Sequence, residues 1–399
     1  MQWCSTSPSS GQFVCLQTLV WCLRFAIVGQ LQTPEVIDDG YVASLRALAL
    51  KFGVDQVGIA PASVMQRARE ALLQRKQAGL ADSMQFTYRN PSRSTDPSLA
   101  VRGAKSMVVA ARSYVLGEPE RPPGAIGAVA RYAWVDHYEP LRIGLQAIVR
   151  RLRSDGYKAV AFADDNSVVD REAAWLAGLG WFGKNANILL PGAGSFFVLG
   201  SVITTAPLPA AAQPIADGCG SCSRCIDGCP TQAIVAPGVV DAGRCLAWLL
   251  QRPGVFPRQF RVALGNRIYG CDECQLVCPP TVRFERMAPP NESKHIHAWV
   301  PLLDILNATD ESLLQSFGRW YLAERNPLWL RRNALIALGN VASGADPRVV
   351  AVLHRYLDDS EPILRAHAVW AAAQLGCRNM LPITDPDPIV VDELRAARS

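Results

Sequence analysis

The chain has 399 residues, of which 49% are hydrophobic and 19% are charged, and its net charge is +5. This length suits two or three domains, and the composition is that of a folded protein, because disordered chains are poorer in apolar residues and carry more net charge. Residues 291–399 carry 11 basic and 13 acidic side chains, which excludes a polycationic tail that binds phosphates nonspecifically.

Residues 1–36 are interpreted as an extension that precedes the folded domains. Their apolar stretch, FVCLQTLVWCLRFAIVG, is shorter than a bilayer span and is interrupted by Gln17 and Arg24, so no transmembrane helix is predicted. A signal peptide is the less favoured alternative, because no basic segment or twin arginine precedes the stretch. We therefore expect a cytoplasmic protein.

Residues 37–212 alternate predicted helices with predicted strands. Helical spacing of apolar residues predicts helices at 41–52, after a capping box of Ser63 and Gln66, at 141–154, and from Val169. Strands are predicted at 54–60, 106–114 and 157–163, with a strand pair 187–190 and 195–204 around Pro191. This alternation predicts an α/β layered domain. A Pro- and Ala-rich linker then leads into residues 213–290.

Residues 291–399 are predicted to form an all-α domain. LRRNALIALG from Leu330 and LRAHAVWAAAQLG from Leu364 begin alike, and both are rich in small residues. Such paired helices are typical of HEAT-like repeats. Two roles stay open for them, which are binding along one face and packing alone.

Eight of the twelve cysteines lie between Cys219 and Cys278, in CxxC steps too short for typical disulfide frameworks. CGSCSRCIDGCP, from Cys219 to Pro230, has the C-x2-C-x2-C-x3-C-P spacing of two-cluster ferredoxins, in which the fourth thiolate ligates the other cluster. The proline lacks an N–H and directs the chain out of the loop. This spacing predicts a ferredoxin-like module.

An incomplete second copy, CDECQLVCPP, begins at Cys271, and Cys245 can supply its missing thiol. Exchange of the fourth ligands then predicts two [4Fe–4S] sites. One takes Cys219, Cys222, Cys225 and Cys278, and the other takes Cys229, Cys245, Cys271 and Cys274. A tetrahedral zinc site is the alternative, but it would leave four of these cysteines unused. The other cysteines, Cys4, Cys15, Cys22 and Cys377, are interpreted as ordinary thiols.

Two adjacent clusters conduct electrons, and the large preceding domain is expected to hold their acceptor. No dinucleotide-binding GxGxxG follows a strand, and no D-x-H-x-x-G cobalamin motif is present. Four stretches, however, resemble the epoxyqueuosine reductase family, and the likeness covers most of residues 37–376. They are AGLGWFGKN from Ala177, GSFFVLG from Gly194, PTQAIVAPGVVDAGRC from Pro230 and GNRIYGCDECQLVCP from Gly265.

The resemblance implies a cytoplasmic, monomeric oxidoreductase that acts on tRNA. In this family, base-off cobalamin binds between the α/β domain and the clusters. The clusters carry electrons from an external low-potential donor, and the epoxide of epoxyqueuosine at wobble position 34 is reduced to an alkene with loss of water. The cofactor supplies the difficult chemistry, and the protein supplies position and protons.

The resemblance also implies site residues. The family's proton donor precedes a D/E-R pair, and the register of Asp170 and Arg171 places it at Asp164. Asp165 is the alternative carboxylate, and Asp170 is interpreted as the N-cap of the following helix. The remaining implied cofactor contacts are Arg93, Arg131, Lys184, Asn185, Ile188 and Asp272.

One block departs from the family pattern. Residues 136–138 read D-H-Y where the family has D-Y-H, which leaves the roles of Asp136 and His137 open. Arg131, in the same block, is also interpretable as a plain salt-bridge partner.

Three other functions stay open at this point. They are a reductive dehalogenase that uses cobalamin and iron–sulfur clusters, a ferredoxin-type electron carrier and a zinc-dependent RNA-binding module. A dehalogenase usually carries a twin-arginine signal, and a simple carrier needs no large α/β domain.

Overall fold

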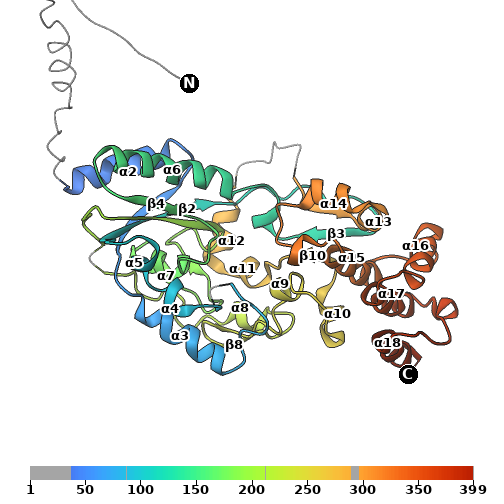
Figure 1. The fold of residues 1–399 in the computed structure, drawn as a ribbon. Helices are drawn as coiled ribbons and strands as arrows, with labels where there is room; N and C mark the ends of the chain where they lie inside the picture. The colour runs from blue at the N-terminus through green and yellow to red at the C-terminus, as the bar shows by residue number, and fades with distance from the viewer. Residues whose placement is uncertain (1–36, 87, 212, 289–295, 399) are drawn as a thin grey trace, which may run out of the picture. The chain divides into compact units, whose positions relative to one another are not determined.

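The computed structural model describes residues 37–86, 88–211, 213–288 and 296–398, which form one compact unit (Figure 1). Among these residues, none of the helices has the length and apolar character that a membrane span requires. The interpretation of residues 1–36, including Cys4, Cys15 and Cys22, concerns residues outside the described ranges.

An antiparallel four-stranded sheet lies at the centre of residues 37–211. Its strands, in spatial order, are β1 (Gln56–Pro61), β2 (Ser106–Ser113), β7 (Phe197–Thr204) and β4 (Ala159–Phe162). The side chains of β2 alternate between two cores, as strand geometry requires. Val108 and Ala110 face one core, and Met107 and Val109 face the other. The sheet is therefore buried on both faces.

Helices cover both faces of this sheet (Figure 1). On one face lie α2 (Asp39–Leu50) and α6 (Tyr138–Ser154), whose Leu45 and Leu145 are fully buried. On the other face lies α7 (Asp170–Leu176), with buried Ala173. The remaining helices of this region are α3 (Gln66–Gln77), α4 (Pro91–Ser94), α5 (Pro97–Ala100) and the 3-10 turn η1 (Arg131–Ala133). The mixed α/β architecture predicted for this region is confirmed.

Two local predictions are wrong. Helix α3 begins after Met65, and no side chain caps it, so the capping box does not form. The strand pair around Pro191 is reduced to a single bridge between Leu190 and Gly194. Strand β6 (Ile188–Leu189) pairs instead with β5 (Trp181–Phe182). The reason is that β2 and β4 occupy both edges of β7.

A three-stranded sheet joins all three predicted segments of the chain. Strand β3 (Ile126–Val129) lies between β10 (Arg267–Tyr269), which is parallel to it, and β11 (Trp299–Pro301), which is antiparallel. A Cβ atom at Gly127 would lie 2.9 Å from side chains of Ile268 and Leu302. Glycine therefore permits the close packing of this sheet.

The cysteine-rich segment consists of short elements. They are α8 (Arg224–Asp227), β8 (Ile234–Ala236), β9 (Val239–Val240), α9 (Leu246–Leu249), α10 (Arg258–Leu264), α11 (Glu273–Leu276) and α12 (Pro279–Glu285). Cys278 is the N-cap of α12, and Pro279 opens that helix. Proline suits this first helical position, where its missing N–H is not needed. The proline after the last cysteine thus starts a helix.

The tail is helical except for β11. Its helices are α13 (Leu302–Asn307), α14 (Asp310–Phe317), α15 (Leu328–Val341), α16 (Pro347–Leu357), α17 (Pro362–Gln374) and α18 (Pro388–Arg398), with 3-10 turns η2 (Ala323–Arg325) and η3 (Arg378–Met380). The two helices predicted from the repeated pattern, α15 and α17, pack against each other. Gly339 of α15 leaves room for Trp370 of α17, since a Cβ there would lie 2.8 Å from the indole.

Arg332 of α15 anchors the tail to the cysteine-rich segment. Its guanidinium is fully buried and donates to the carbonyls of Leu249, Arg252 and Gly254. Burial, together with nearby arginines, lowers its pKa to about 9. The backbone carbonyls satisfy the donors that burial removes from water.

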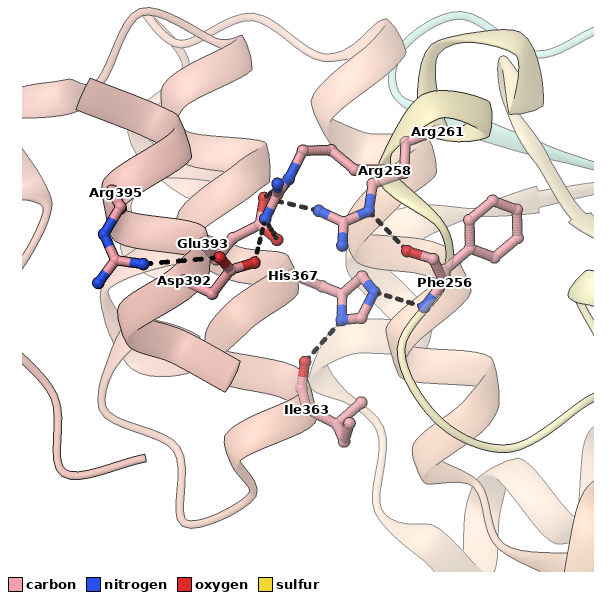
Figure 2. Close-up of polar contacts among 8 residues, drawn as sticks. All are labelled: Phe256, Arg258, Arg261, Ile363, His367, Asp392, Glu393 and Arg395. Atoms are coloured by element: carbon pink, nitrogen blue, oxygen red, sulfur yellow. Dashed lines mark hydrogen bonds and ion pairs between the residues drawn. The ribbon is translucent and has the colours of Figure 1, made fainter. Parts of the chain in front are cut away.

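A second attachment joins α10 to α17 and α18 (Figure 2). Arg261 forms an ion pair with Glu393 at 2.9 Å, and both side chains are buried. Arg258, which is partly exposed, contacts Glu393 at 3.1 Å and Asp392 at 2.8 Å. His367 accepts the Phe256 N–H at 3.2 Å, and burial holds its pKa well below the usual value, so the imidazole is neutral.

We expect Glu393→Gln to destabilise the attachment of α18 by about 3–5 kcal/mol, because it leaves the buried Arg261 charge uncompensated. Asp392→Asn is the matched control. It removes a carboxylate one residue away that is 63% exposed, against 4% for Glu393, and it should change stability by about 0–1 kcal/mol. Denaturant unfolding and hydrogen exchange of α18 measure both effects. Equal effects of the two changes would contradict the role given to burial.

Candidate functional site

A cavity of about 570 Å³ lies between the four-stranded sheet domain and the cysteine-rich segment. The carboxyl group of Asp164 and the side chains of Asn185 and Ile188 come from the sheet domain. The cysteine-rich segment contributes Asp272 and four cysteines, which are Cys229, Cys245, Cys271 and Cys274. Groups that the sequence separates by 41 to 110 residues therefore line one space.

The eight predicted ligand thiols form two groups. The thiol of Cys225 interacts electrostatically with those of Cys219, Cys222 and Cys278. The thiol of Cys274 interacts with the other quartet, namely Cys229, Cys245 and Cys271. These groups coincide with the two ligand sets deduced from spacing, including the exchanged fourth ligands.

The thiols could not all ionise without a compensating cation. Burial raises the pKa of Cys271 to about 12 and that of Cys274 well above its usual value, and neighbouring thiols raise both further. Four half-buried thiolates in one place therefore require positive charge, which iron–sulfur clusters supply. Among the described residues, no group of three or more His, Cys, Asp and Glu side chains could hold a single metal ion.

The two quartets differ in their relation to the cavity. All four thiols of the Cys229 quartet line it, whereas none of the Cys219 quartet does. We call them the near quartet and the far quartet. Electrons that enter at the far quartet would therefore reach the cavity through the near quartet.

The two adjacent aspartates after β4, Asp164 and Asp165, have different roles. Asp164 has a positive φ of 56° and lines the cavity. Although the residue is exposed, as Asp165 is, desolvation of its carboxyl raises the pKa, which Arg142 opposes and to which Asp165 adds. Asp165 is exposed and accepts the Ser167 N–H at 2.7 Å. The carboxyl group on the cavity is thus the one at Asp164.

Asp170 also lines the cavity, which the sequence did not indicate. It is the first residue of α7, and the N-cap is Val169, so the capping interpretation is wrong. Its Oδ1 atom is buried and has no hydrogen-bond partner. Burial, and then the charge of Asp164, raises the pKa of Asp170 well above its usual value.

The D-H-Y block places tyrosine, and not histidine, on the cavity. Tyr138 lines it, and burial together with Asp164 raises the pKa of the phenol. Asp136 accepts the N–H groups of Tyr138 and Glu139 at 3.0 Å each and so begins α6. His137 is buried, and burial with nearby arginines lowers its pKa to about 4. Asp136 and His137 do not line the cavity.

Asp272 is held on the wall between two thiols of the near quartet. Its Oδ2 accepts the backbone N–H of Arg131 at 2.6 Å, and its Oδ1 accepts from Gln275 at 3.1 Å. Burial raises the pKa of Asp272 to about 6, and the contacts with Arg131 oppose this rise. The Arg131 side chain itself forms ion pairs with Glu118, at 2.8 Å, and with Glu285. Arg131 thus supports the wall without lining it.

Of the other implied contacts, some line the cavity and some do not. Asn185 lines the cavity and donates to the Cys274 carbonyl at 3.2 Å, which ties the two walls together. Lys184 donates to the Gly220 carbonyl at 2.7 Å, in the loop of the far quartet. Arg93 lies in α4 and is exposed. Neither Lys184 nor Arg93 lines the cavity.

The chain is similar to several known proteins. Residues 218–281 match a family model described as a 4Fe-4S double cluster binding domain. A protein of Bacillus anthracis named epoxyqueuosine reductase is 33% identical over 339 residues, covering 83% of this chain and 88% of that protein. One of Xanthomonas campestris with the same name is 34% identical, covering 87% and 99%.

Solved structures agree with these matches. A crystal structure described as epoxyqueuosine reductase with an epoxyqueuosine-modified tRNA stem loop has a TM-score of 0.81 at 27% identity, covering 90% of this chain and 99% of that one. A Bacillus subtilis structure, described as having its catalytic aspartate loop swung out of the active site, has a TM-score of 0.76 at 28% identity, covering 90% and 94%.

Proposed function

The chain belongs to the epoxyqueuosine reductase family, and on that premise we propose that it reduces epoxyqueuosine at wobble position 34 of tRNA to queuosine. The observation that carries this proposal is the cavity. The near quartet and Asp164 both line it, so a source of electrons and a source of protons share the same space. Reduction of an epoxide to an alkene and water needs both.

Cobalamin is the proposed cofactor of the cavity. Asn185, Ile188 and Asp272 would hold it between the sheet domain, which acts as the cobalamin-binding domain, and the near quartet. The fit rests on the cavity of about 570 Å³ beside the near quartet and on the buried Asp272 carboxyl that faces it. When bound, cobalamin supplies a low-valent cobalt that delivers electrons to the epoxide.

Residues of the chain supply protons and hold the groups of the site in position. Asp164 is the proposed general acid, because burial of its carboxyl raises its pKa and so favours the protonated form that can donate. The Bacillus subtilis structure is described with its catalytic aspartate loop swung out of the active site, and Asp164 lies in a turn with a positive φ. The Arg131 backbone N–H and Gln275 orient Asp272. The near quartet would then pass electrons to the cavity from an external low-potential donor.

The proposed partner is the anticodon stem-loop of the tRNA. Residues 37–212 carry 20 basic and 15 acidic side chains, and residues 213–290 carry 8 and 6. Residues of these two segments line the cavity, and the segments carry the excess of basic side chains, while the lining itself has four acidic and two basic side chains. The tail, residues 291–399, is proposed to be a HEAT-like domain that adds contacts to the stem-loop through complementary shape. The protein is proposed to act as a cytoplasmic monomer.

We expect stem-loop affinity to fall as salt rises, because each phosphate contact releases counterions and adds roughly 0.7–0.9 to the slope of log affinity against log salt. A stem-loop with unmodified guanine is the matched control. It has the same phosphates, so it should show the same slope with a weaker affinity. Fluorescence anisotropy over a salt series measures both slopes. Binding that does not respond to salt would count against an RNA substrate.

The proposed function is tested by anaerobic purification, metal analysis and a turnover assay. We expect eight iron atoms for two [4Fe–4S] clusters, bound cobalt after loading, little zinc, and conversion of an epoxyqueuosine stem-loop with a strong reductant. Iron without corrinoid binding would favour a simple electron carrier, and zinc in place of iron would favour the zinc-dependent RNA-binding module. Turnover of halogenated substrates but not of the stem-loop would favour a reductive dehalogenase.

A further inference from the structure

The balance of the proposed reaction requires more than one acid. Both carbon–oxygen bonds of the epoxide break, an alkene forms, and the oxygen leaves as water. The step therefore consumes two electrons, which the clusters supply, and two protons. Asp164 holds only one proton at a time. A second proton must therefore reach the reaction, and a carboxyl group on the same cavity can supply it.

We propose that Asp170 supplies the second proton by reprotonating Asp164 during the turnover. This inference rests on the proposed function, because it needs a reaction that consumes two protons. Asp170 acts through Asp164: it stores a proton and passes it to Asp164, and it does not itself donate to the substrate. Asp164 gives its proton to the departing oxygen, takes the proton of Asp170, and gives that one as the oxygen leaves as water. Solvent then reprotonates both carboxylates.

Neither a helix cap nor a hydrogen bond to Oδ1 accounts for the position of the Asp170 side chain. It does not cap α7, because the N-cap is Val169. Its Oδ1 atom is buried without a hydrogen-bond partner, a state that costs about 1–3 kcal/mol for a polar group and more for a charged one. A carboxyl group in this state avoids the larger cost by keeping its proton.

The groups around the two carboxyls favour a shared proton. Asp164 and Asp170 interact electrostatically, and both line the cavity. Two carboxyls at one site do not ionise together readily, so one of them stays protonated. Of the two, Asp170 is the more deeply buried, and it therefore keeps its proton longer as pH rises.

Other charged or titratable groups face the pair from several elements. Arg142 and Tyr138 of α6, Asp165 of the adjoining turn, Arg171 of α7 and Tyr269 of β10 all interact with one or both carboxyls. Arg171 donates to the carbonyl of Ala186 at 3.3 Å, so part of its hydrogen-bonding capacity is used elsewhere. Tyr138 stays neutral, because burial, and then Asp164 and Asp170, raise the pKa of its phenol.

The test compares Asp170→Asn with Asp170→Glu in the cofactor-loaded enzyme. We expect Asp170→Asn to lower kcat about 10- to 100-fold with little change in KM, because substrate binding does not involve the stored proton. The alkaline limb of the pH–rate profile should move to lower pH, since the group that holds its proton longest is gone. Asp170→Glu keeps a carboxyl group and should restore most of the rate. Asp165→Asn is the control at an exposed carboxylate and should behave nearly as the wild type.

A second readout does not depend on activity. Infrared difference spectra of the same proteins, recorded during a pH titration, should show one protonated carboxyl fewer in Asp170→Asn than in the wild type near neutral pH. An unchanged pH–rate profile in Asp170→Asn would overturn the inference, and so would Asn and Glu variants that are equally impaired and equally unstable. Wild-type protein that fails to convert the stem-loop would instead refute the proposed function. The two failures are thus distinguishable.

Discussion

Asp164→Asn is expected to lower turnover by about 10²- to 10⁴-fold, the range over which a general acid contributes to rate. Asparagine keeps the shape and the hydrogen-bonding capacity of the side chain but has no carboxylic proton to give. Asp164 is not among the predicted cluster ligands, so cluster content, cobalamin loading and cobalt reduction should not change. Stem-loop affinity should also stay near that of the wild type. Single-turnover conversion, measured beside cobalt reduction, separates a lost acid from a broken electron path.

The residues near Asp164 supply the controls for this prediction. Asp165→Asn should have a mild effect, because Asp165 is exposed and bonds within its own turn. If Asp165→Asn is the inactive variant, the acid lies one residue later than we propose. If both variants turn over normally while Asp136→Asn or His137→Ala is inactive, the proton comes from the D-H-Y block instead.

Cys229→Ser is expected to abolish turnover by removing the near cluster while the far cluster stays. Cys229 belongs by sequence to the same loop as Cys219, Cys222 and Cys225, yet its thiol lies with Cys245, Cys271 and Cys274. Serine is a poor ligand for iron, so the near cluster should be lost or incomplete. Iron content should fall to about half, and electron paramagnetic resonance of the reduced protein should retain one cluster signal.

Cys225→Ser is the matched control, four residues earlier in the same loop. It should damage the far cluster and leave the near one beside the cavity. Loss of the far cluster alone in Cys229→Ser would contradict the ligand exchange. Because Cys225→Ser keeps the near cluster, which faces the cavity, the chemically reduced variant is expected to keep measurable single-turnover activity.

Local patterns predicted the parts of the site that depend on short-range spacing. The thiols of Cys219, Cys222 and Cys225 lie within one loop, so their grouping follows from chain geometry alone. Asp164 was implied by the resemblance to the family, through the register of Asp170 and Arg171. Asp170 was not implied as a site residue, because a helix-opening aspartate usually caps the helix, and only the packing of α7 against the cavity shows that its carboxyl is unpartnered.

The fold shows the same division between local and distant information. Apolar periodicity predicted α6, which buries one face. An apolar run predicted β2, which is buried on both faces. The pairing of β3 with β10 and β11 depends on residues far apart in the chain, and no local signal specifies it. The failed strand pair around Pro191 has the same cause, because the partners of β7 come from distant positions.

The three-stranded sheet can form only late in synthesis, because its last strand, β11, follows β3 at a long distance in the chain. Strand β3 leaves the ribosome long before β10 and β11, and its two edges stay unpaired until those strands arrive. An unpaired edge is a template for pairing with other chains, and domains generally fold in the order in which they are made. Truncation before β11 would leave this hazard permanent. The contribution of the tail to RNA binding is therefore better measured by substitutions on its surface than by deletion from Asn291.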